Sequence, residues 1–455
     1  MDLEEQTLET SRHTQMIIDF ICDTQYEDIP AEAIENAKAR ILDCIGVTIK
    51  GGEESVGTVI KEFAGLYGGK EQATIINAKM RSDVLTAVFA NGTMSHAIDY
   101  DDHYVLSHPS IGPFAALLPV AELVNATGKE IVTAFAVGLE FSTKFQMACT
   151  IEPWYNGFHS TGLWNTMAAC VTAGKLLKLS KEQMLMAFGT ACSSFCGIKR
   201  NMGTMTKSYH NGRAGDGGVR AALLAKLGFT SHPDAFEGRF GFLHVFVKEL
   251  EPRFQYIEEL GKDWDLVNHP TLIKPHPSCG GTHAAMNGML QLIREHDIYE
   301  QDVDHVDVGM NQGGVDSLYY PEPKNIYEAK FSMHFVIALL LHYRRWGVDL
   351  HTNEVVNSPE MRALYPKVNF FVDEELDREI PREMTDYHAI VTVYMKDGAV
   401  HRIHSNPPRL SWEQIKEKYD QTVVGVIDKE RSEAIVDVVR SLEARSLSDL
   451  MPLLA

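Results

Sequence analysis

The sequence lacks several features that would assign it at once to a large class of proteins. Its 455 residues contain 7 cysteines, an odd number, and most stand inside apolar runs, as reduced buried thiols do and a disulfide framework does not. No apolar run is long enough to cross a membrane. Residues 1–14 are polar and acidic, unlike a signal peptide or a basic transit segment. We therefore expect a cytoplasmic protein with no membrane partner.

Positive charge and nucleotide-binding motifs are also scarce. The formal net charge is −20 and no run of lysine and arginine reverses it, which argues against a nucleic-acid partner. The chain has no phosphate-binding loop, no Gly-x-Gly-x-x-Gly after a strand and no Gly-x-Ser-x-Gly elbow. These absences disfavour nucleotide cofactors and serine hydrolysis, and we expect no cofactor. An acidic protein that binds an acidic metabolite must instead gather its cations locally.

What the chain does contain is a long series of helical patterns followed by a mixed segment. Apolar residues recur at helical spacing through most of residues 14–227, and many of these helices are rich in alanine and glycine. Residues 303–310 alternate as a strand does, and residues 389–404 read as a hairpin. We predict a mainly α protein with a large all-helical domain over 1–265, completed by 405–455, and a smaller α+β lid domain over 266–404. A cleft between the two is the expected ligand site.

The most concentrated chemistry lies in residues 203–218. Lys207, Tyr209, His210 and Arg213 stand within seven residues, among glycines that let a backbone and a ligand approach closely. If this segment is helical, Lys207 and His210 share a face. A fixed cation beside a group that titrates near neutrality suits an anionic substrate whose proton must move. The alternative is a surface turn with scattered polar residues.

A second stretch, residues 96–110, is rich in histidine and aspartate. His96, Asp99 and His103 stand at i, i+3 and i+7, so they would share a helix face and could bind a metal if a helix continues through them. The His-Glu-x-x-His signature of helix-borne zinc sites is absent. We therefore favour a metal-free interpretation in which Asp99 orients an imidazole and His108 stands at a loop-to-helix turn.

Two further segments could contribute to a site. His159 precedes an alanine- and glycine-rich helix that Ser160 or Thr161 could cap, and such an N-terminus can bind a carboxylate. An ordinary capped turn explains this segment equally well. Lys274 is a candidate cation, whereas Cys279 lacks an activating partner in the sequence, so we expect it to line the site passively.

These motifs together resemble the MmgE/PrpD family, and the resemblance covers nearly the whole chain. It rests on Asn91-Gly92-Thr93 through His96–Asp102 and His108-Pro109, Gly157-Phe158-His159 with Gly174-Lys175-Leu176-Leu177, Gly203–Lys207 with His210 and Gly212-Arg213-Ala214, Lys274-Pro275 with Cys279, Ala329-Lys330-Phe331-Ser332, and Asn406-Pro407 before Ser411-Trp412. The family includes 2-methylcitrate dehydratase, cis-aconitate decarboxylase and iminodisuccinate epimerase. The resemblance implies a helical domain with an α+β lid, a homodimer, and metal-free acid–base chemistry on small polycarboxylates.

Transferred by motif position, the resemblance assigns residues to the pocket. The implied catalytic residues are His108, His159, Lys207 and His210, and the implied substrate-binding residues are Asp99, His103, Lys274, Cys279 and Arg213. Three positions depart from the decarboxylase-like pattern: Cys279 replaces a histidine, Phe335 replaces an aromatic hydroxyl, and His103 replaces a threonine. These departures argue against decarboxylation of cis-aconitate and weaken the dehydratase assignment, and the Lys-Pro-x-Pro-Ser-Cys segment is closer to epimerase-like branches.

The leading hypothesis is a lyase that removes a proton next to a substrate carboxylate. Lys207 and Lys274 would stabilise the resulting charge, His159 or His210 would be the base, and His108 the partner acid. We favour elimination of water, with decarboxylation as the other lyase outcome and epimerisation of an aminodicarboxylate such as iminodisuccinate as the alternative. Two other hypotheses stay open: a non-catalytic carboxylate-binding homologue, and a metal-dependent hydro-lyase that uses the residues at 96, 99 and 103.

Overall fold

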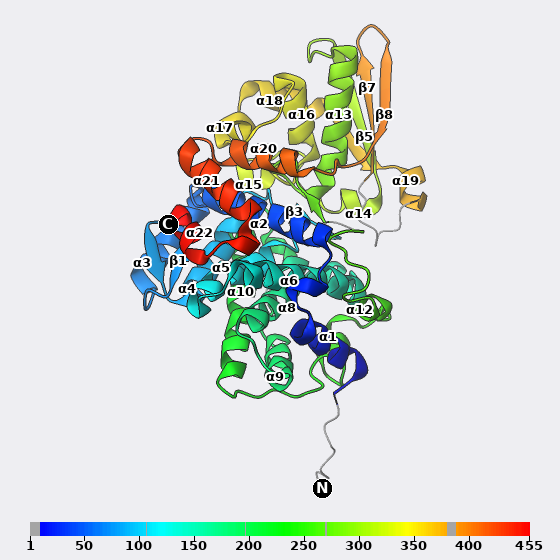
Figure 1. Cartoon of the computed structure of the whole chain (residues 1–455). Helices are drawn as coiled ribbons and strands as arrows, with labels where there is room; N and C mark the ends of the chain where they lie inside the picture. Colours follow the sequence, from blue (N-terminus) through cyan, green and yellow to red (C-terminus); the bar gives the residue numbers. More distant parts are fainter. Residues whose placement is uncertain (1–9, 106, 196, 269–270, 380–387) are drawn as a thin grey trace.

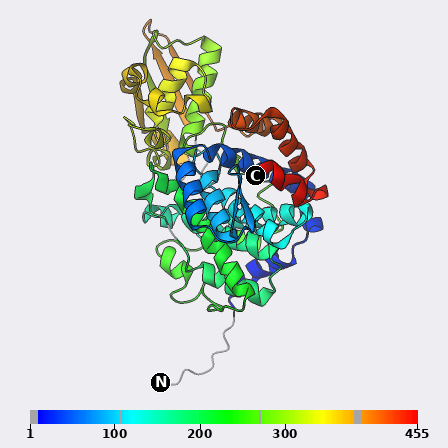
Figure 2. The same cartoon turned by 90° about the vertical axis from the view of Figure 1, so that its left-hand side faces the viewer.

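The computed structural model describes residues 10–105, 107–195, 197–268, 271–379 and 388–455. A body of helices carries a smaller part built around a β-sheet (Figure 1), and the side view shows the same two parts (Figure 2). The chain is thus mainly α with a smaller α+β part, as predicted. Within the described residues, no helix combines the length and the apolar character that a membrane crossing requires.

The helical part follows the apolar periodicity of the sequence closely. Its main helices are α1 (Arg12–Asp23), α2 (Ala31–Gly51), α3 (Ser55–Tyr67), α4 (Val84–Ser95), α5 (Ile111–Val124), α6 (Gly128–Ala148), α8 (Ser160–Leu176), α9 (Lys181–Ala191) and α10 (Met205–Lys226). Short elements join them: β1 (Ala73–Ile75), β2 (Met80–Ser82), β3 (Asp102–His103), α7 (Glu152–Tyr155), α11 (Phe242–Phe246) and α12 (Gln255–Glu258). Apolar side chains from most of these helices form one continuous buried core.

Helix α10 runs through the middle of this part, and it is longer than its sequence pattern predicts. The apolar pattern indicates a helix only from Val219, yet the helix begins at Met205, where the Thr204 side chain accepts a hydrogen bond from Thr206 N. Its glycines lower helix propensity but let neighbours approach: a Cβ at Gly212 would collide with α4, and one at Gly218 with the backbone of α8. Close packing therefore outweighs local propensity here.

The smaller part is a four-stranded sheet covered by helices. The strand order is β6 (Val368–Val372), β5 (Val303–Met310), β7 (Ala389–Met395), β8 (Val400–Ser405), and only the β5–β6 pair is parallel. Its helices are α13 (His283–His296), α14 (Gln312–Val315), α15 (Ile326–Ala329), α16 (Met333–Tyr343), α17 (Asn353–Val356), α18 (Pro359–Leu364) and α19 (Glu374–Glu379). The predicted strand at 303–310 and the predicted hairpin are confirmed, whereas the short exposed strand β6 gave no clear alternation.

The last 50 residues return to the helical part. Helices α20 (Trp412–Val423), α21 (Lys429–Arg440) and α22 (Leu447–Leu454) contribute Tyr419, Val439 and Leu450 to the helical core. Both views place these red helices against the helical body (Figures 1 and 2). The chain leaves that body beside β4 (Leu272–Ile273), which pairs with β3, and comes back after β8. We therefore keep the division at 265 and 405 as our proposed domain boundaries.

Candidate active site

The loop between α4 and α5 carries most of the acidic groups of the site. Helix α4 ends at Ser95, and Asp99 has a left-handed backbone with φ of 54°, so the helix that the metal alternative requires through residues 96–103 does not form. The chain turns instead and enters β3, where His103 pairs with Leu272. The ring of His103 lies against Gly280, where any Cβ would collide with it. His103 is therefore separated from His96 and Asp99.

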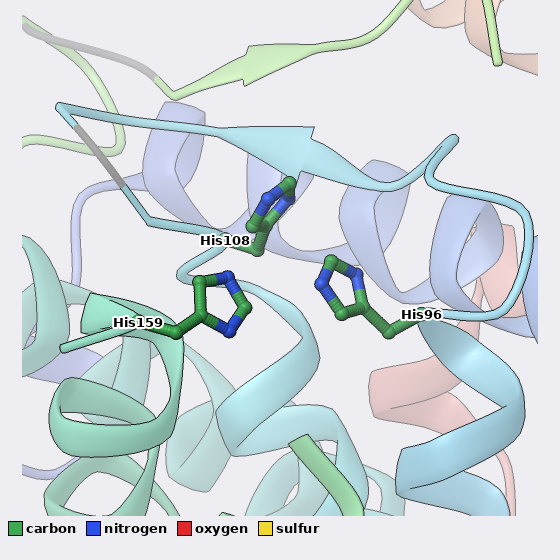
Figure 3. Close-up of side chains that lie close together, drawn as sticks. All are labelled: His96, His108 and His159. Atoms are coloured by element: carbon green, nitrogen blue, oxygen red, sulfur yellow. The ribbon is translucent and has the colours of Figure 1, made fainter. Parts of the chain in front are cut away.

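Three histidine rings converge at this loop: His96 and His108 belong to the loop itself, and His159 directly precedes α8. Figure 3 shows His96, His108 and His159 with their rings directed toward one another. The ring centroids of His96 and His108 are 4.3 Å apart, and those of His96 and His159 are 6.0 Å apart. His159 itself is the N-cap residue of α8, so neither Ser160 nor Thr161 caps this helix. The helix start thus places an imidazole at the site.

Asp99 joins two lysines that are far apart in the sequence. Its Oδ1 lies 2.9 Å from Lys207 Nζ and 2.6 Å from Lys274 Nζ, and all three side chains are buried. Lys207 Nζ is also 2.8 Å from Nε2 of His96. Burial would raise the pKa of Asp99, but the two ammonium groups outweigh it and hold that pKa well below its ordinary value. Asp99 therefore stays ionised between two cations.

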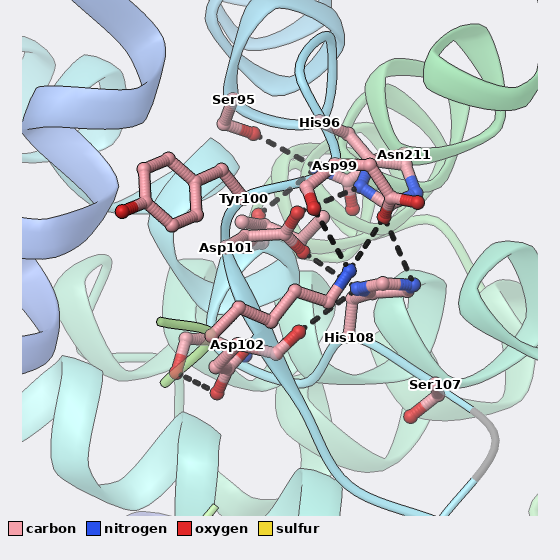
Figure 4. A network of polar contacts seen from close by, with 12 residues as sticks. Ser95, His96, Asp99, Tyr100, Asp101, Asp102, Ser107, His108 and Asn211 are labelled. Carbon is pink, nitrogen blue, oxygen red and sulfur yellow. Dashed lines mark hydrogen bonds and ion pairs between the residues drawn. The ribbon is translucent and has the colours of Figure 1, made fainter. Parts of the chain in front are cut away.

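A second carboxylate, Asp101, holds the histidines (Figure 4). Its Oδ2 lies 2.7 Å from Nδ1 of His108, and its Oδ1 lies 3.2 Å from Nδ1 of His96. Burial favours a raised pKa for Asp101, yet the neighbouring imidazoles and Lys274 bring that pKa well below its usual value. Asp99 is 3.8 Å from Nε2 of His108, whereas Nδ1 of His108 is hydrogen-bonded to the carbonyl oxygen of Asp102 at 2.8 Å, so the orienting role expected for Asp99 falls to Asp101 and the backbone of Asp102.

His159 and His210 form a direct pair on the other side of Lys207. Their Nδ1 atoms are 2.9 Å apart, so one imidazole donates its proton to the other. Burial, then the charge of Lys207, lowers the pKa of His159 well below its usual value. Burial and neighbouring groups lower the pKa of His210 to about 4. Both imidazoles are therefore neutral at physiological pH. Lys207 and His210 indeed share one face of α10, as the sequence predicts.

These eight side chains are called the polar cluster below. The polar cluster consists of His96, Asp99, Asp101, His108, His159, Lys207, His210 and Lys274. Within the described part of the chain, two subsets bring their ligand atoms within 4.8 Å, as a metal site would: His96, Asp99, Asp101 and His108, or His96, His108 and His159. His103 belongs to neither subset, which corrects the metal set expected from the sequence. The ammonium of Lys207 contacts His96 and Asp99 directly, so a positively charged side chain already occupies the position that a metal ion would take between these two residues.

Family models match both parts of this chain. The model for the MmgE/PrpD N-terminal domain matches residues 15–255, and the model for the MmgE/PrpD C-terminal domain matches residues 276–444. The chain belongs to the MmgE/PrpD family. Human cis-aconitate decarboxylase is 25% identical over 90% of this chain and 87% of its own length. A cis-aconitate decarboxylase-like protein of Aspergillus oryzae is 24% identical over 97% of each chain. A mitochondrial 2-methylcitrate dehydratase of Yarrowia lipolytica is 23% identical over 86% of this chain and 78% of its own length.

Four expected or departing positions of this MmgE/PrpD protein lie outside the polar cluster. Arg213 pairs with Asp216 on its own helix, and 39% of its side chain is exposed, so within the described residues no contact supports a substrate-binding role. Phe335 is fully buried in the apolar core of the lid, edge-on to His351. His103 is buried, which lowers its pKa to about 3, with Lys274 acting in the same direction. The departures at 335 and 103 thus change the packing around the cluster.

Cys279 is the third departure, and the charges of Asp99 and Lys274 act on its thiol. The side chain is partly buried and packs with Phe331 at the edge of the lid. Burial raises the pKa of the Cys279 thiol, and the negative charge of Asp99 raises it further. The thiol therefore stays protonated, which fits the passive lining role expected from the sequence better than a nucleophile.

Sequence reasoning missed three contributors to the site. The sequence suggested His96 only as part of a metal-like pattern and Asp101 only as part of the family motif, although both are buried. Lys330 was not assigned any role, yet its ammonium is buried and donates to the carbonyl oxygen of Ala97 at 2.9 Å. The signal for Lys330 was the Ala-Lys-Phe-Ser motif, in which a lysine stands directly before a buried phenylalanine and a helix cap.

Proposed function

We propose that this MmgE/PrpD protein is a metal-free lyase that removes a proton next to a carboxylate of a small di- or tricarboxylate. The observation that carries the proposal is the pair of buried ammonium groups on Asp99, set beside a hydrogen-bonded pair of neutral histidines. Cations bind and stabilise a substrate anion, and neutral imidazoles can accept a proton. The polar cluster supplies both functions in one place.

The lysines can serve a substrate without giving up Asp99. An ammonium group has three N–H donors. Lys207 directs two of them to Asp99 and His96, and Lys274 directs its own to the side chain and the carbonyl of Asp99. Each ammonium thus has a donor left for a substrate carboxylate. The negative charge that develops when the proton leaves would be stabilised by the same two donors.

The histidine pair always presents a base. In an Nδ1–H···Nδ1 hydrogen bond between neutral imidazoles, the donor has no proton on Nε2, so that nitrogen can accept one. Whichever of His159 and His210 donates is therefore the base. Nδ1 of His108 lies 2.7 Å from Oδ2 of Asp101 and 2.8 Å from the carbonyl oxygen of Asp102, so in the neutral imidazole Nδ1 carries the proton and Nε2 does not. Asp101 favours the protonated imidazole, but burial and the neighbouring lysines outweigh it and hold the pKa of His108 well below its usual value. His108 can therefore give a proton from Nε2 to the leaving group only after Nε2 has accepted one.

We propose elimination of water as the outcome, with decarboxylation as the other lyase reaction. The relatives above are named as decarboxylases and a dehydratase, which supports lyase chemistry on small carboxylates. The departure at Cys279 argues against decarboxylation of cis-aconitate, and it keeps epimerisation as a close alternative to elimination. Reprotonation on the opposite face would give an epimerase of an aminodicarboxylate. A homodimer remains a prediction of the family resemblance.

The deciding experiment is proton exchange in deuterated water, followed by NMR, with citrate-like, aconitate-like and aminodicarboxylate compounds. We expect solvent deuterium to enter one carbon next to a carboxylate, and the accompanying product to separate the three outcomes. Lys207→Met should abolish the exchange and His159→Ala should slow it, because His210 remains as a base, and Arg213→Gln serves as the matched control on α10. Full exchange in both variants would refute the proposal, and binding without exchange would favour a non-catalytic homologue.

The metal-dependent hydro-lyase is the second candidate, because the two histidine-containing subsets have metal-like spacing. Metal analysis of the purified protein and activity after dialysis against a chelator test it. We expect unchanged turnover after chelation. Loss of turnover that Zn²⁺ or Mn²⁺ restores would establish the metal-dependent reaction instead.

A further inference from the structure

The loop that carries Asp99 and Asp101 is held from outside the polar cluster by two lysines. Lys330 belongs to the lid and Lys418 to helix α20 of the C-terminal segment. Lys330 Nζ donates to the carbonyl oxygen of Ala97 at 2.9 Å, and Lys418 Nζ donates to the carbonyl oxygen of Tyr100 at 2.5 Å. The two contacts thus flank Asp99, two residues before it and one residue after it.

Lys418 is built into the interior together with its counterion. Its ammonium lies 2.6 Å from Oδ1 of Asp43 on α2, and it also lies over the ring of Tyr100, 4.1 Å from the ring centroid. Lys418, Asp43 and Tyr100 are all more than nine-tenths buried. A buried ion pair contributes little net stability compared with apolar packing, so its contact with the loop carbonyl indicates a role in geometry.

The loop needs such support because of its own conformation. Asp99 adopts a left-handed backbone, which is unfavourable for a residue with a Cβ and persists only where the surroundings enforce it. The carbonyl groups of Ala97 and Tyr100 have no place in a helix or strand ladder, and buried carbonyl groups require donors. Ammonium donors form short, charge-assisted bonds to them.

We propose that Lys330 and Lys418 are positioning residues that fix the loop bearing Asp99, one from the lid and one from the C-terminal segment. Each acts through the backbone of the loop and so sets the position of Asp99 between Lys207 and Lys274. The lid and the C-terminal helix are thereby made part of the active arrangement. The kinetic part of this inference rests on the proposed function, whereas the structural part does not.

The test compares Lys330→Met and Lys418→Met with Lys38→Met. Lys38 is the matched control, because it is equally buried and also joins α2 to the C-terminal segment, through the carbonyl of Arg440 and the carboxylate of Glu443, but it does not contact the loop. Hydrogen–deuterium exchange of the peptide that covers residues 96–102 reports the loop. Calorimetric titration with tricarballylate, an unreactive tricarboxylate, reports the cation pair.

We expect at least tenfold faster amide exchange in the loop and at least tenfold weaker tricarballylate binding for both loop variants. Lys38→Met should lower the thermal midpoint while leaving both readouts as in the wild type. Unchanged loop exchange in the two loop variants, or an equal change in Lys38→Met, would overturn the inference. If the wild type does not bind tricarballylate, the proposed function is in question, but the exchange comparison still decides the role of the lysines.

A single substitution could leave a buried charge unpaired and prevent folding. The double variant Asp43→Asn/Lys418→Met removes both charges and avoids this problem. Lys418→Gln keeps a neutral donor for the carbonyl of Tyr100. We expect Lys418→Gln to recover part of the loop protection and the double variant to recover none. Equal protection in the two variants would contradict a positioning role for the lysine.

Discussion

Replacing Asp99 by asparagine tests the electrostatic centre of the site. The substitution keeps the size of the side chain and removes the charge that Lys207 and Lys274 share at 2.9 and 2.6 Å. All three groups are buried, so two ammonium groups lose their counterion in a place that water does not reach. Breaking a buried ion pair by neutralising one partner costs about 3–5 kcal/mol. We expect Asp99→Asn to lower the free energy of unfolding by about that amount at pH 7.

Urea denaturation followed by circular dichroism measures this loss. Asp349→Asn is the control, since Asp349 also accepts two N–H groups, from Arg345, but 63% of its side chain is exposed. Exposed pairs contribute about 0–1 kcal/mol, so the control should change little. A loss below about 1 kcal/mol for Asp99→Asn would refute the shared-counterion interpretation.

The pH dependence gives the same prediction an independent check. The pKa of Asp99 in the folded protein lies well below its ordinary value of 3.8, so its stabilisation is present above pH 4 and is lost as the pH falls toward the folded pKa. In Asp99→Asn, buried Lys207 no longer has the carboxylate that stabilised its charge, so burial favours the neutral amine. A folded pKa below the unfolded value makes stability rise with pH, so the defect should shrink between pH 7 and pH 10. A constant defect over that range would contradict the argument.

Three further predictions concern single groups of the site. The pKa of His210 is lowered to about 4, and that of its partner His159 lies well below its usual value. The acidic limb of the pH profile of kcat/KM should therefore lie below pH 5. An acidic limb at pH 6.5 would contradict a neutral base pair. Burial keeps the Cys279 thiol protonated, so iodoacetamide should alkylate Cys279 about tenfold more slowly than it alkylates the thiol of glutathione at pH 7.5. Mass spectrometry follows the reaction, and equal rates for the two thiols would show an activated thiolate. Lys207→Met should lower kcat/KM by about 100-fold or more in steady-state assays, as loss of a transition-state donor does, whereas Arg213→Gln should stay within about twofold. The reverse order would move the substrate to the exposed face of α10 that carries Arg213.

Much of the fold could be predicted from the sequence because local patterns specify it. The helices of the first part and the strand at 303–310 follow from apolar spacing alone. Prediction failed where packing outweighs propensity or where the chain turns. Helix α10 extends through four glycines because neighbouring helices such as α4 and α8 pack closely against it. The spacing of His96, Asp99 and His103 left a helix open, but the chain turns at Asp99. The short exposed strand β6 pairs with residues of β5 that are about 60 positions earlier in the sequence, so no local pattern specifies it.

The sequence by itself determined which chemical groups are available and which families of reaction they suit. Histidines, lysines and aspartates within short motifs, in an acidic chain without nucleotide or zinc signatures, already indicated acid–base chemistry on a carboxylate. Only the tertiary structure decided how these groups are shared. In the structure, Asp99 contacts two lysines, Asp101 contacts two histidines, and His159 is hydrogen-bonded to His210. Such partnerships depend on burial and on distances between segments a hundred or more residues apart in several cases, and local spacing carries no information about either.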